Sequence, residues 1–177
     1  MHSAHDKGSK NRKNVVLEGV DRSGKSTIAG RLSDLHYHVI HCPYRPSYED
    51  MYQHYRELIQ QAPYPVVFDR SFIAEAVYGP ILRGASRLSS HEFEELLRLL
   101  AAKNFAVCYL REQSHILWDR LLQTPHEHNL VLRHFSELVM AYDRCMEMVA
   151  AFVPTHTICP TDLSLESILD QFISLIS

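Results

Sequence analysis

The stretch Glu18-Gly19-Val20-Asp21-Arg22-Ser23-Gly24-Lys25-Ser26-Thr27 decides the fold of this 177-residue chain. Its residues 19–26 have the spacing G-x-x-x-x-G-K-[ST] and follow directly on the apolar run Val15-Val16-Leu17. A helical segment begins at Ser26, so the loop lies between a strand and a helix. In that context the backbone N–H groups of the loop turn inward and lead to a helix N-terminus, which favours anions. The sequence therefore predicts a phosphate-binding loop.

The residue types in the loop suit a nucleotide polyphosphate. Gly19 and Gly24 let the backbone approach phosphate oxygens closely and adopt conformations closed to other residues. Lys25 can reach the β- and γ-phosphates, and the Ser26 hydroxyl is placed to ligate Mg²⁺. We therefore expect ATP as the phosphoryl donor and Mg²⁺ as the cofactor. The remaining predicted phosphate-binding residues are Ser23 and Thr27.

Further short apolar runs follow the loop at residues 37–42, 65–69, 105–110 and 155–159. They are rich in Val, Ile, Phe, Tyr or Cys, as fully buried parallel strands are. Helical patterns separate them, and one of these has a capping-box start at Ser89 with Glu92. Strands that alternate with helices predict an α/β fold in three layers, α/β/α, around a five-stranded parallel sheet. Trp118 lies among aliphatic residues, and we expect it in the core.

The composition indicates one globular domain. Hydrophobic residues make up 46% and charged residues 22% of the chain, which argues against disorder. We expect residues 14–177 to form a single domain and the polar residues 1–13 to form a flexible tail. The longest apolar runs, 105–110 and 148–153, are too short to cross a bilayer, and the polar N-terminus shows no signal peptide.

Net charge, cysteine spacing and histidine spacing argue against several kinds of partner and site. The net charge is −3, with +3 in residues 1–13 and therefore −6 in the remainder, which argues against a nucleic-acid or anionic-lipid partner. The four cysteines show no C-x-x-C spacing, so we expect reduced thiols and a cytoplasmic protein. His126-Glu127-His128 has no matching third ligand, and we expect a solvated loop there rather than a metal site.

A second motif, Val66-Val67-Phe68-Asp69-Arg70-Ser71, follows the third predicted strand. Together with the phosphate-binding loop, it resembles the thymidylate kinases, a branch of the P-loop nucleoside monophosphate kinases. The continuation Glu75-Ala76-Val77-Tyr78-Gly79 resembles the variant seen in phage-type deoxynucleotide kinases. The resemblance covers most of residues 14–177 in element order. It implies the P-loop nucleoside monophosphate kinase fold, phosphoryl transfer from ATP–Mg²⁺ to a deoxynucleoside monophosphate such as dTMP, and a homodimer.

The resemblance also implies roles for single residues. Asp21 would accept a hydrogen bond from the sugar 3′-hydroxyl of the acceptor, and Arg22 would stabilise charge on the transferring phosphoryl group. Asp69 would act on Mg²⁺ and its waters, while Arg70 would hold the acceptor phosphate. Arg45 lies where the family has a second clamp for that phosphate.

Other predicted site residues lie on helices. Glu75 and Tyr78 are three residues apart and would share a helix face near Arg70. Arg120 and Arg133 flank a predicted lid at about residues 123–130. The lid itself contains no arginine, as the resemblance implies for family members that carry this arginine in the phosphate-binding loop.

Three departures from the family pattern leave the base open. Ser71, Ala74 and Gly79 stand where the family has an aromatic residue, a serine and a base-reading glutamine. Candidates for stacking on a base, each equally a packing residue, are Tyr48, Tyr52, Tyr55 and Phe72.

Three rival functions stay open at this point. A deoxynucleoside kinase benefits from a carboxylate base after the second strand, but here that position reads His41-Cys42-Pro43-Tyr44-Arg45. A kinase acting on modified bases in DNA fits poorly with the acidic body. A nucleotide-binding regulatory module has no use for an acceptor clamp such as Asp69-Arg70.

Overall fold

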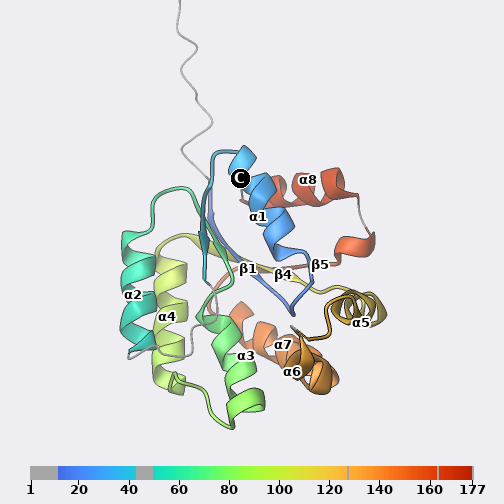
Figure 1. The fold of residues 1–177 in the computed structure, drawn as a ribbon. Coiled ribbons are helices and arrows are strands. Elements are labelled where there is room, and N and C mark those ends of the chain that lie inside the picture. The colour runs from blue at the N-terminus through green and yellow to red at the C-terminus, as the bar shows by residue number, and fades with distance from the viewer. Residues whose placement is uncertain (1–11, 43–49, 127, 163, 177) are drawn as a thin grey trace, which may run out of the picture.

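Figure 1 shows the computed structural model of the chain, which describes residues 12–42, 50–126, 128–162 and 164–176. Its strands form one parallel sheet in the order β2-β3-β1-β4-β5. Their bounds are Asn14–Glu18 for β1, His38–His41 for β2, Val66–Asp69 for β3, Phe105–Leu110 for β4 and Thr155–Ile158 for β5. The five predicted strands are confirmed, and β2 and β5 end one residue earlier than the apolar runs indicated.

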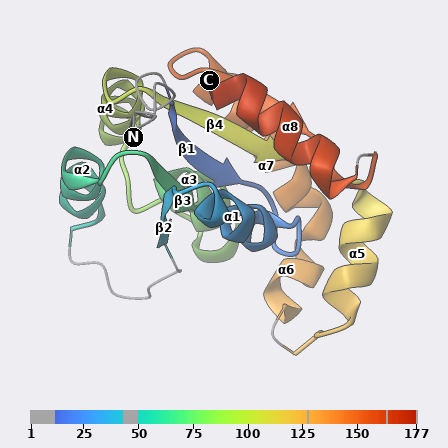
Figure 2. The same ribbon diagram turned by 90° about the horizontal axis from the view of Figure 1, so that it is seen from above.

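Alternate residues of the central strand β1 supply two separate cores. Val15 and Leu17 pack with α1 (Lys25–Asp34) and α8 (Leu165–Ile176) on one face of the sheet. Val16 packs on the opposite face, where the larger core lies. That face is covered by α2 (Met51–Gln61), α3 (Phe72–Arg83), α4 (Ser90–Ala102) and α7 (Phe135–Ala150). The predicted three-layer α/β/α architecture is therefore confirmed, and Figure 2 shows the helices on both sides of the sheet.

Two helix starts follow from local hydrogen bonds, and that of α4 was predicted. Ser89 and Glu92 form the capping box of α4, with both reciprocal hydrogen bonds present. Ser71 caps α3, because its Oγ accepts a hydrogen bond from the Ile73 amide. The remaining helices are α5 (Ser114–Leu122) and α6 (Asn129–Arg133). A 3₁₀ turn, η2 (Pro160–Asp162), lies between β5 and α8.

One expectation about a single residue changes. Trp118 is 39% exposed and packs edge-on against Phe135 instead of lying in the core, whose α5 contacts come from Leu117 and Leu121. Arg12 and Lys13, the described residues of the predicted flexible tail, are held by the domain. Arg12 Nη1 donates to the Leu35 carbonyl at 3.0 Å, and the Lys13 carbonyl accepts from the Tyr37 hydroxyl at 3.2 Å.

The parallel topology brings several loops to one edge of the sheet. The loop after β1 and the Asp69-Arg70-Ser71 segment at the end of β3 meet there, and Glu112 follows β4 at the same edge. Ligand sites of open α/β sheets lie at the carboxyl ends of the strands. No helix in the described part of the chain has the length and apolar character to cross a bilayer.

Candidate active site

The phosphate-binding loop connects β1 to α1 through residues with left-handed backbone conformations. Gly19 has a φ of 147°, and a Cβ there would lie 2.7 Å from the Leu110 carbonyl oxygen, so no larger residue fits. Gly24, with a φ of 98°, precedes α1, which begins without a side-chain cap. The first amide groups of such a helix have no intrahelical acceptor and favour a bound anion.

Lys25 lies inside this loop and is only 4% exposed. Its Nζ donates to the carbonyl oxygens of Gly19 and Val20 at 2.7 and 2.9 Å. Burial lowers the pKa of Lys25 to about 8, and the neighbouring Arg70 lowers it as well, while nearby carboxylates oppose the shift. A polyphosphate in the loop would favour the charged form of this lysine.

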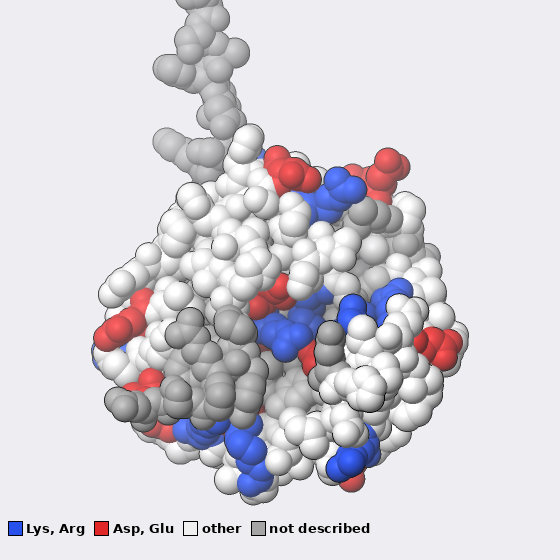
Figure 3. Space-filling view, in the orientation of Figure 1, with Lys and Arg blue, Asp and Glu red and all other residues white. Residues whose placement is uncertain are grey.

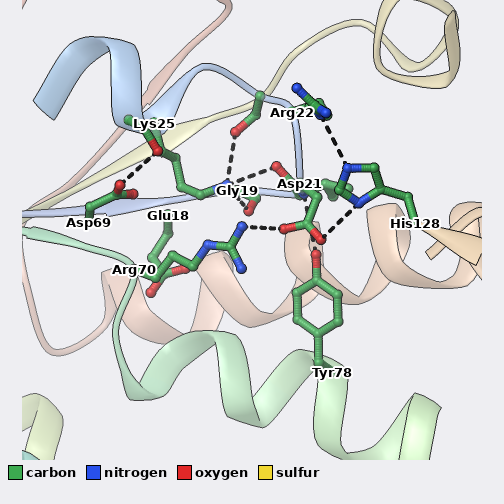
Figure 4. A network of polar contacts seen from close by, with 12 residues as sticks. Glu18, Gly19, Asp21, Arg22, Lys25, Asp69, Arg70, Tyr78 and His128 are labelled. Atoms are coloured by element: carbon green, nitrogen blue, oxygen red, sulfur yellow. Dashed lines mark hydrogen bonds and ion pairs between the residues drawn. The ribbon is translucent and has the colours of Figure 1, made fainter. Parts of the chain in front are cut away.

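Asp69 lies beside Lys25 (Figure 4), and its carboxylate forms a small polar cluster with the Ser26 hydroxyl. Ser26 Oγ donates to Asp69 Oδ2 at 2.8 Å, and His41 Nδ1 lies 2.9 Å from the same oxygen. Asp69 Oδ1 is buried and has no hydrogen-bond partner among the residues that the structure describes. Carboxylate and hydroxyl oxygens are ligands that Mg²⁺ binds, so Asp69 and Ser26 are suitable ligands for this ion.

Arg70 enters the same site from β3. It has a φ of 71°, and its Nη2 donates to Asp21 Oδ1 at 2.5 Å. Burial lowers the pKa of Arg70, but the Asp21 carboxylate and the hydroxyls of Tyr142 and Tyr78 raise it more, so the guanidinium stays charged. The Tyr78 hydroxyl in turn accepts a hydrogen bond from the Asp21 amide at 3.3 Å. Asp21, Arg70 and Tyr78 are thus brought together as the sequence predicted (Figure 4).

A buried carboxylate that the sequence analysis did not single out lies behind this group. Glu18, at the end of β1, is fully buried and accepts a hydrogen bond of 2.7 Å from Ser71 Oγ. The Tyr142 hydroxyl donates to its other oxygen at 3.4 Å. Burial raises the pKa of Glu18 to about 7, against the lowering effects of Ser71 and the nearby Lys25 and Arg70. Glu18 therefore links the loop after β1 to the segment after β3.

Residues between α5 and α6 contact the phosphate-binding loop. Arg22 donates from Nη2 to Thr124 Oγ1 at 2.6 Å and from Nε to His128 Nε2 at 3.2 Å. Arg120 donates to the Arg22 carbonyl at 3.2 Å and pairs with the fully buried Glu112 at 3.1 Å. His128 is 16% exposed in its side chain, so the expectation of a solvated loop is wrong at this residue, while His126 is exposed.

Several predicted site residues lie elsewhere. Glu75 is buried on α3, where it forms an ion pair with Arg83 and accepts a hydrogen bond of 2.9 Å from the Arg87 amide. A Cβ at Gly79 would lie 2.8 Å from Glu75 Oε1. The Glu75–Arg83 ion pair therefore occupies the space beside position 79, where the family pattern has a glutamine. Arg133 is exposed at the end of α6 and is not among the residues that line the cleft described below.

The candidates for base stacking are packing residues where the structure describes them. Phe72 and Tyr55 lie in the larger core and contact each other edge-on at 5.7 Å between ring centroids. Tyr52 donates to Glu95 at 2.9 Å and so joins α2 to α4. Tyr48 and Arg45 lie outside the described residues.

The assembled residues line a cleft of about 750 Å³. Its basic lining residues are Arg22, Lys25, Arg70 and Arg120, and its walls also include Asp21, Gln123, His128 and residues 23–28 of the loop and α1. Figure 3 shows basic side chains gathered in the middle of this face, although the chain as a whole is acidic. A cleft with several fixed cations, a buried lysine and a helix N-terminus is suited to binding polyphosphate groups.

Solved structures that superpose on this chain include proteins with bound nucleotides and proteins named as kinases. The YorR protein from Bacillus subtilis, solved in complex with phosphorylated GDP, superposes with a TM-score of 0.77 at 23% identity, over 92% of this chain and 94% of that one. Deoxyadenosine kinase from M. mycoides with bound dCTP gives a TM-score of 0.61 at 15% identity, over 91% and 97% of the two chains. Thymidylate kinase from Candida albicans gives a TM-score of 0.57 at 14% identity, over 94% of this chain and 91% of that one.

These likenesses show that the chain has the three-layer fold of the P-loop nucleotide kinases. At the level of sequence, no family model matches the chain, and no curated protein matches it.

Glu18 and Glu112 are residues at the site that the sequence analysis did not single out, while Thr124 and His128 lie within the predicted lid at about residues 123–130 but received no individual role. Glu18 and Glu112 could have been found, because each is a carboxylate at or just after the end of a buried strand, where parallel sheets carry their sites. Thr124 and His128 carry no such signal, since their roles depend on how the segment between α5 and α6 packs against Arg22.

Proposed function

We propose that this protein is an ATP-dependent kinase that transfers a phosphoryl group to a deoxynucleoside monophosphate, dTMP or a related nucleotide, and forms the diphosphate. The observation that carries the proposal is the presence of two basic side chains from different segments in one cleft. Lys25 belongs to the loop after β1, and Arg70 belongs to the segment after β3. One cation suits the donor and the other suits the phosphate of the acceptor.

The donor half of the site consists of the phosphate-binding loop and the Ser26–Asp69 cluster. The loop amides and Lys25 would hold the β- and γ-phosphates of ATP, with Gly19, Ser23, Gly24, Ser26 and Thr27 as the further phosphate-binding residues. Ser26 and Asp69, 2.8 Å apart, would hold Mg²⁺ directly or through its waters. When bound, Mg²⁺ neutralises charge on the phosphate oxygens and orients them.

The acceptor half consists of Arg70, Asp21 and Tyr78. Asp21 fixes the guanidinium of Arg70 at 2.5 Å, and the Tyr78 hydroxyl fixes the Asp21 backbone at 3.3 Å. Arg70 would bind the acceptor phosphate, and Asp21 would accept a hydrogen bond from the sugar. Arg22, above both halves, would stabilise charge on the transferring group. Catalysis of this kind depends on positioning and charge, and an ionised phosphate acceptor needs no general base.

A deoxynucleoside kinase is the second candidate, because the fold also superposes on deoxyadenosine kinase. A hydroxyl acceptor would be served by a carboxylate after β2. The described residues at that position, His41 and Cys42, are not acidic, and His41 instead contacts Asp69 at 2.9 Å. This chemistry favours the phosphate-bearing acceptor.

We further propose a cytoplasmic location and small nucleotides as partners. The four cysteines form no disulfide among the residues that the structure describes, and three of them are buried. Four basic side chains line the cleft. Dimerisation is proposed from the resemblance alone.

An ADP-release assay over acceptor classes tests this proposal. We expect ADP release from ATP–Mg²⁺ with deoxynucleoside monophosphates, and little with nucleosides or single-stranded DNA. Lys25→Ala provides the blank, and we expect it to stay folded and to lose turnover by at least about a hundredfold, because the donor phosphates lose their buried cation. Activity like that of the wild type in this variant would contradict the assignment of the loop.

A further inference from the structure

His128 occupies a place in the cleft that the proposed function does not use. It reaches the site from the segment between α5 and α6, while the residues it contacts, Asp21 and Arg22, belong to the phosphate-binding loop (Figure 4). Its side chain is 16% exposed and lines the cleft. His128 and Arg22 are 106 positions apart in the sequence. Their contact joins the segment between α5 and α6 to the phosphate-binding loop.

The geometry determines what the imidazole does. Arg22 Nε donates to His128 Nε2 at 3.2 Å, so Nε2 acts as an acceptor and the ring proton is on Nδ1. His128 Nδ1 is directed toward the Asp21 side, 3.8 Å from Oδ2. The ring therefore lies between the arginine proposed to act on the transferring phosphoryl group and the carboxylate proposed to face the acceptor sugar.

The Arg22 side chain must be held by neighbouring groups if it is to keep one orientation. It is exposed, its φ of 66° is left-handed, and a long arginine side chain has many rotamers to lose when it is fixed. Neighbouring residues hold it in place, since Thr124 accepts from Nη2, His128 accepts from Nε and Arg120 donates to its backbone carbonyl. The two side-chain acceptors define the plane of the guanidinium.

We propose that His128 is a positioning residue for phosphoryl transfer, which orients Arg22 from across the cleft through Nε2 while its Nδ1 edge faces Asp21. The inference rests on the proposed function. Because His128 acts through Arg22, its loss reduces stabilisation of the transition state and leaves binding of the two nucleotides largely as it was.

Two isosteric variants separate the two edges of the ring. Glutamine places an amide oxygen near the position of Nε2, whereas asparagine reaches only the position of Nδ1. We expect His128→Asn to lower kcat about tenfold or more, which corresponds to the loss of one well-placed hydrogen bond, with both KM values within about threefold. We expect His128→Gln to keep kcat within about threefold of the wild type, since the contact to Arg22 is retained. His115→Ala, which removes an exposed histidine of α5 outside the cleft, is the matched control and should leave kcat unchanged.

A double-mutant cycle tests whether His128 acts through Arg22. In an Arg22→Ala background, His128→Asn should cost less than about twofold in kcat, because the group that it positions is gone. Full additivity of the two losses, or equal kcat values for His128→Asn and the wild type, would overturn the inference. A wild-type protein that releases no ADP would instead contradict the proposed function and this inference with it, so the two failures are distinguishable.

Discussion

At the scale of single residues, the site depends on charged groups that are buried in opposing pairs. Lys25, Glu18, Asp69 and Glu112 are each no more than about 5% exposed, which is costly for a charged group unless a partner is close. Glu112 is paired with Arg120 at 3.1 Å, and Glu18 is hydrogen-bonded by Ser71 at 2.7 Å. The folded protein thus places buried carboxylates next to the basic residues of the cleft.

Glu18 gives a prediction about stability and pH. Its folded-state pKa of about 7 is raised above the ordinary value of 4.5, so between these values the folded protein holds a proton that the unfolded chain releases. The corresponding stability is fully present below about pH 4.5 and is lost as the pH rises through 7. We expect Glu18→Gln to unfold with a free energy about 1–3 kcal/mol higher than the wild type at pH 8, because the glutamine carries no buried charge.

Urea denaturation at pH 5 and pH 8 measures this difference. The advantage of Glu18→Gln should shrink toward zero at pH 5, and the exposed Glu147→Gln should show no comparable change. A variant less stable than the wild type at both pH values would show that the carboxylate is worth more than its desolvation costs.

At the scale of elements, each segment ends where its capping or turn residues dictate. α4 begins at its capping box, and α3 begins where Ser71 caps it directly after Arg70. The same serine therefore ends the β3 segment, starts α3 and bonds to Glu18. The position of Arg70 in the cleft follows from these local contacts.

Two glycines within helices offer a matched test of packing. A Cβ on Gly79 of α3 would lie 2.8 Å from Glu75 Oε1 and 3.0 Å from the Ala85 carbonyl, whereas a Cβ on Gly30 of α1 meets no atom within 4 Å. We expect Gly79→Ala to lower the free energy of unfolding by about 1–3 kcal/mol through overpacking. Gly30→Ala should raise it by about 0.5–1 kcal/mol, because alanine favours the helix. Thermal unfolding measures both, and a stable Gly79→Ala protein would show that the Glu75–Arg83 pair moves aside.

Sequence reasoning reached the elements more easily than the contacts between them. The loop at residues 19–26, the strands and the capping box at Ser89 are local signals, and the structure has all of them. The approach of His128 to Arg22 and the exposure of Trp118 depend on how α5 and α6 pack, which no local pattern encodes. Glu75 shows the same limit, since its helix face was predicted near Arg70 but its carboxylate turns to Arg83.

At the scale of the whole molecule, the fold concentrates charge that the composition conceals. The net charge is −3, yet Arg22, Lys25, Arg70 and Arg120 line one cleft at the carboxyl edge of the sheet. Arg22 and Lys25 come from the phosphate-binding loop, Arg70 from the segment after β3 and Arg120 from α5, and the parallel topology brings them together. A basic cleft in an acidic protein favours small, highly charged ligands over an extended polyanion.

The steady-state kinetics of Arg70→Ala test the central claim, that one cleft binds a donor nucleotide through Lys25 and an acceptor phosphate through Arg70. We expect the KM for the deoxynucleoside monophosphate to rise about tenfold or more, as expected for the loss of hydrogen bonds to a charged group, while the KM for ATP stays within about twofold. Arg98→Ala, which removes an exposed arginine from α4, should change neither value. An equal rise in both KM values, or ADP release that does not depend on the acceptor, would contradict the account.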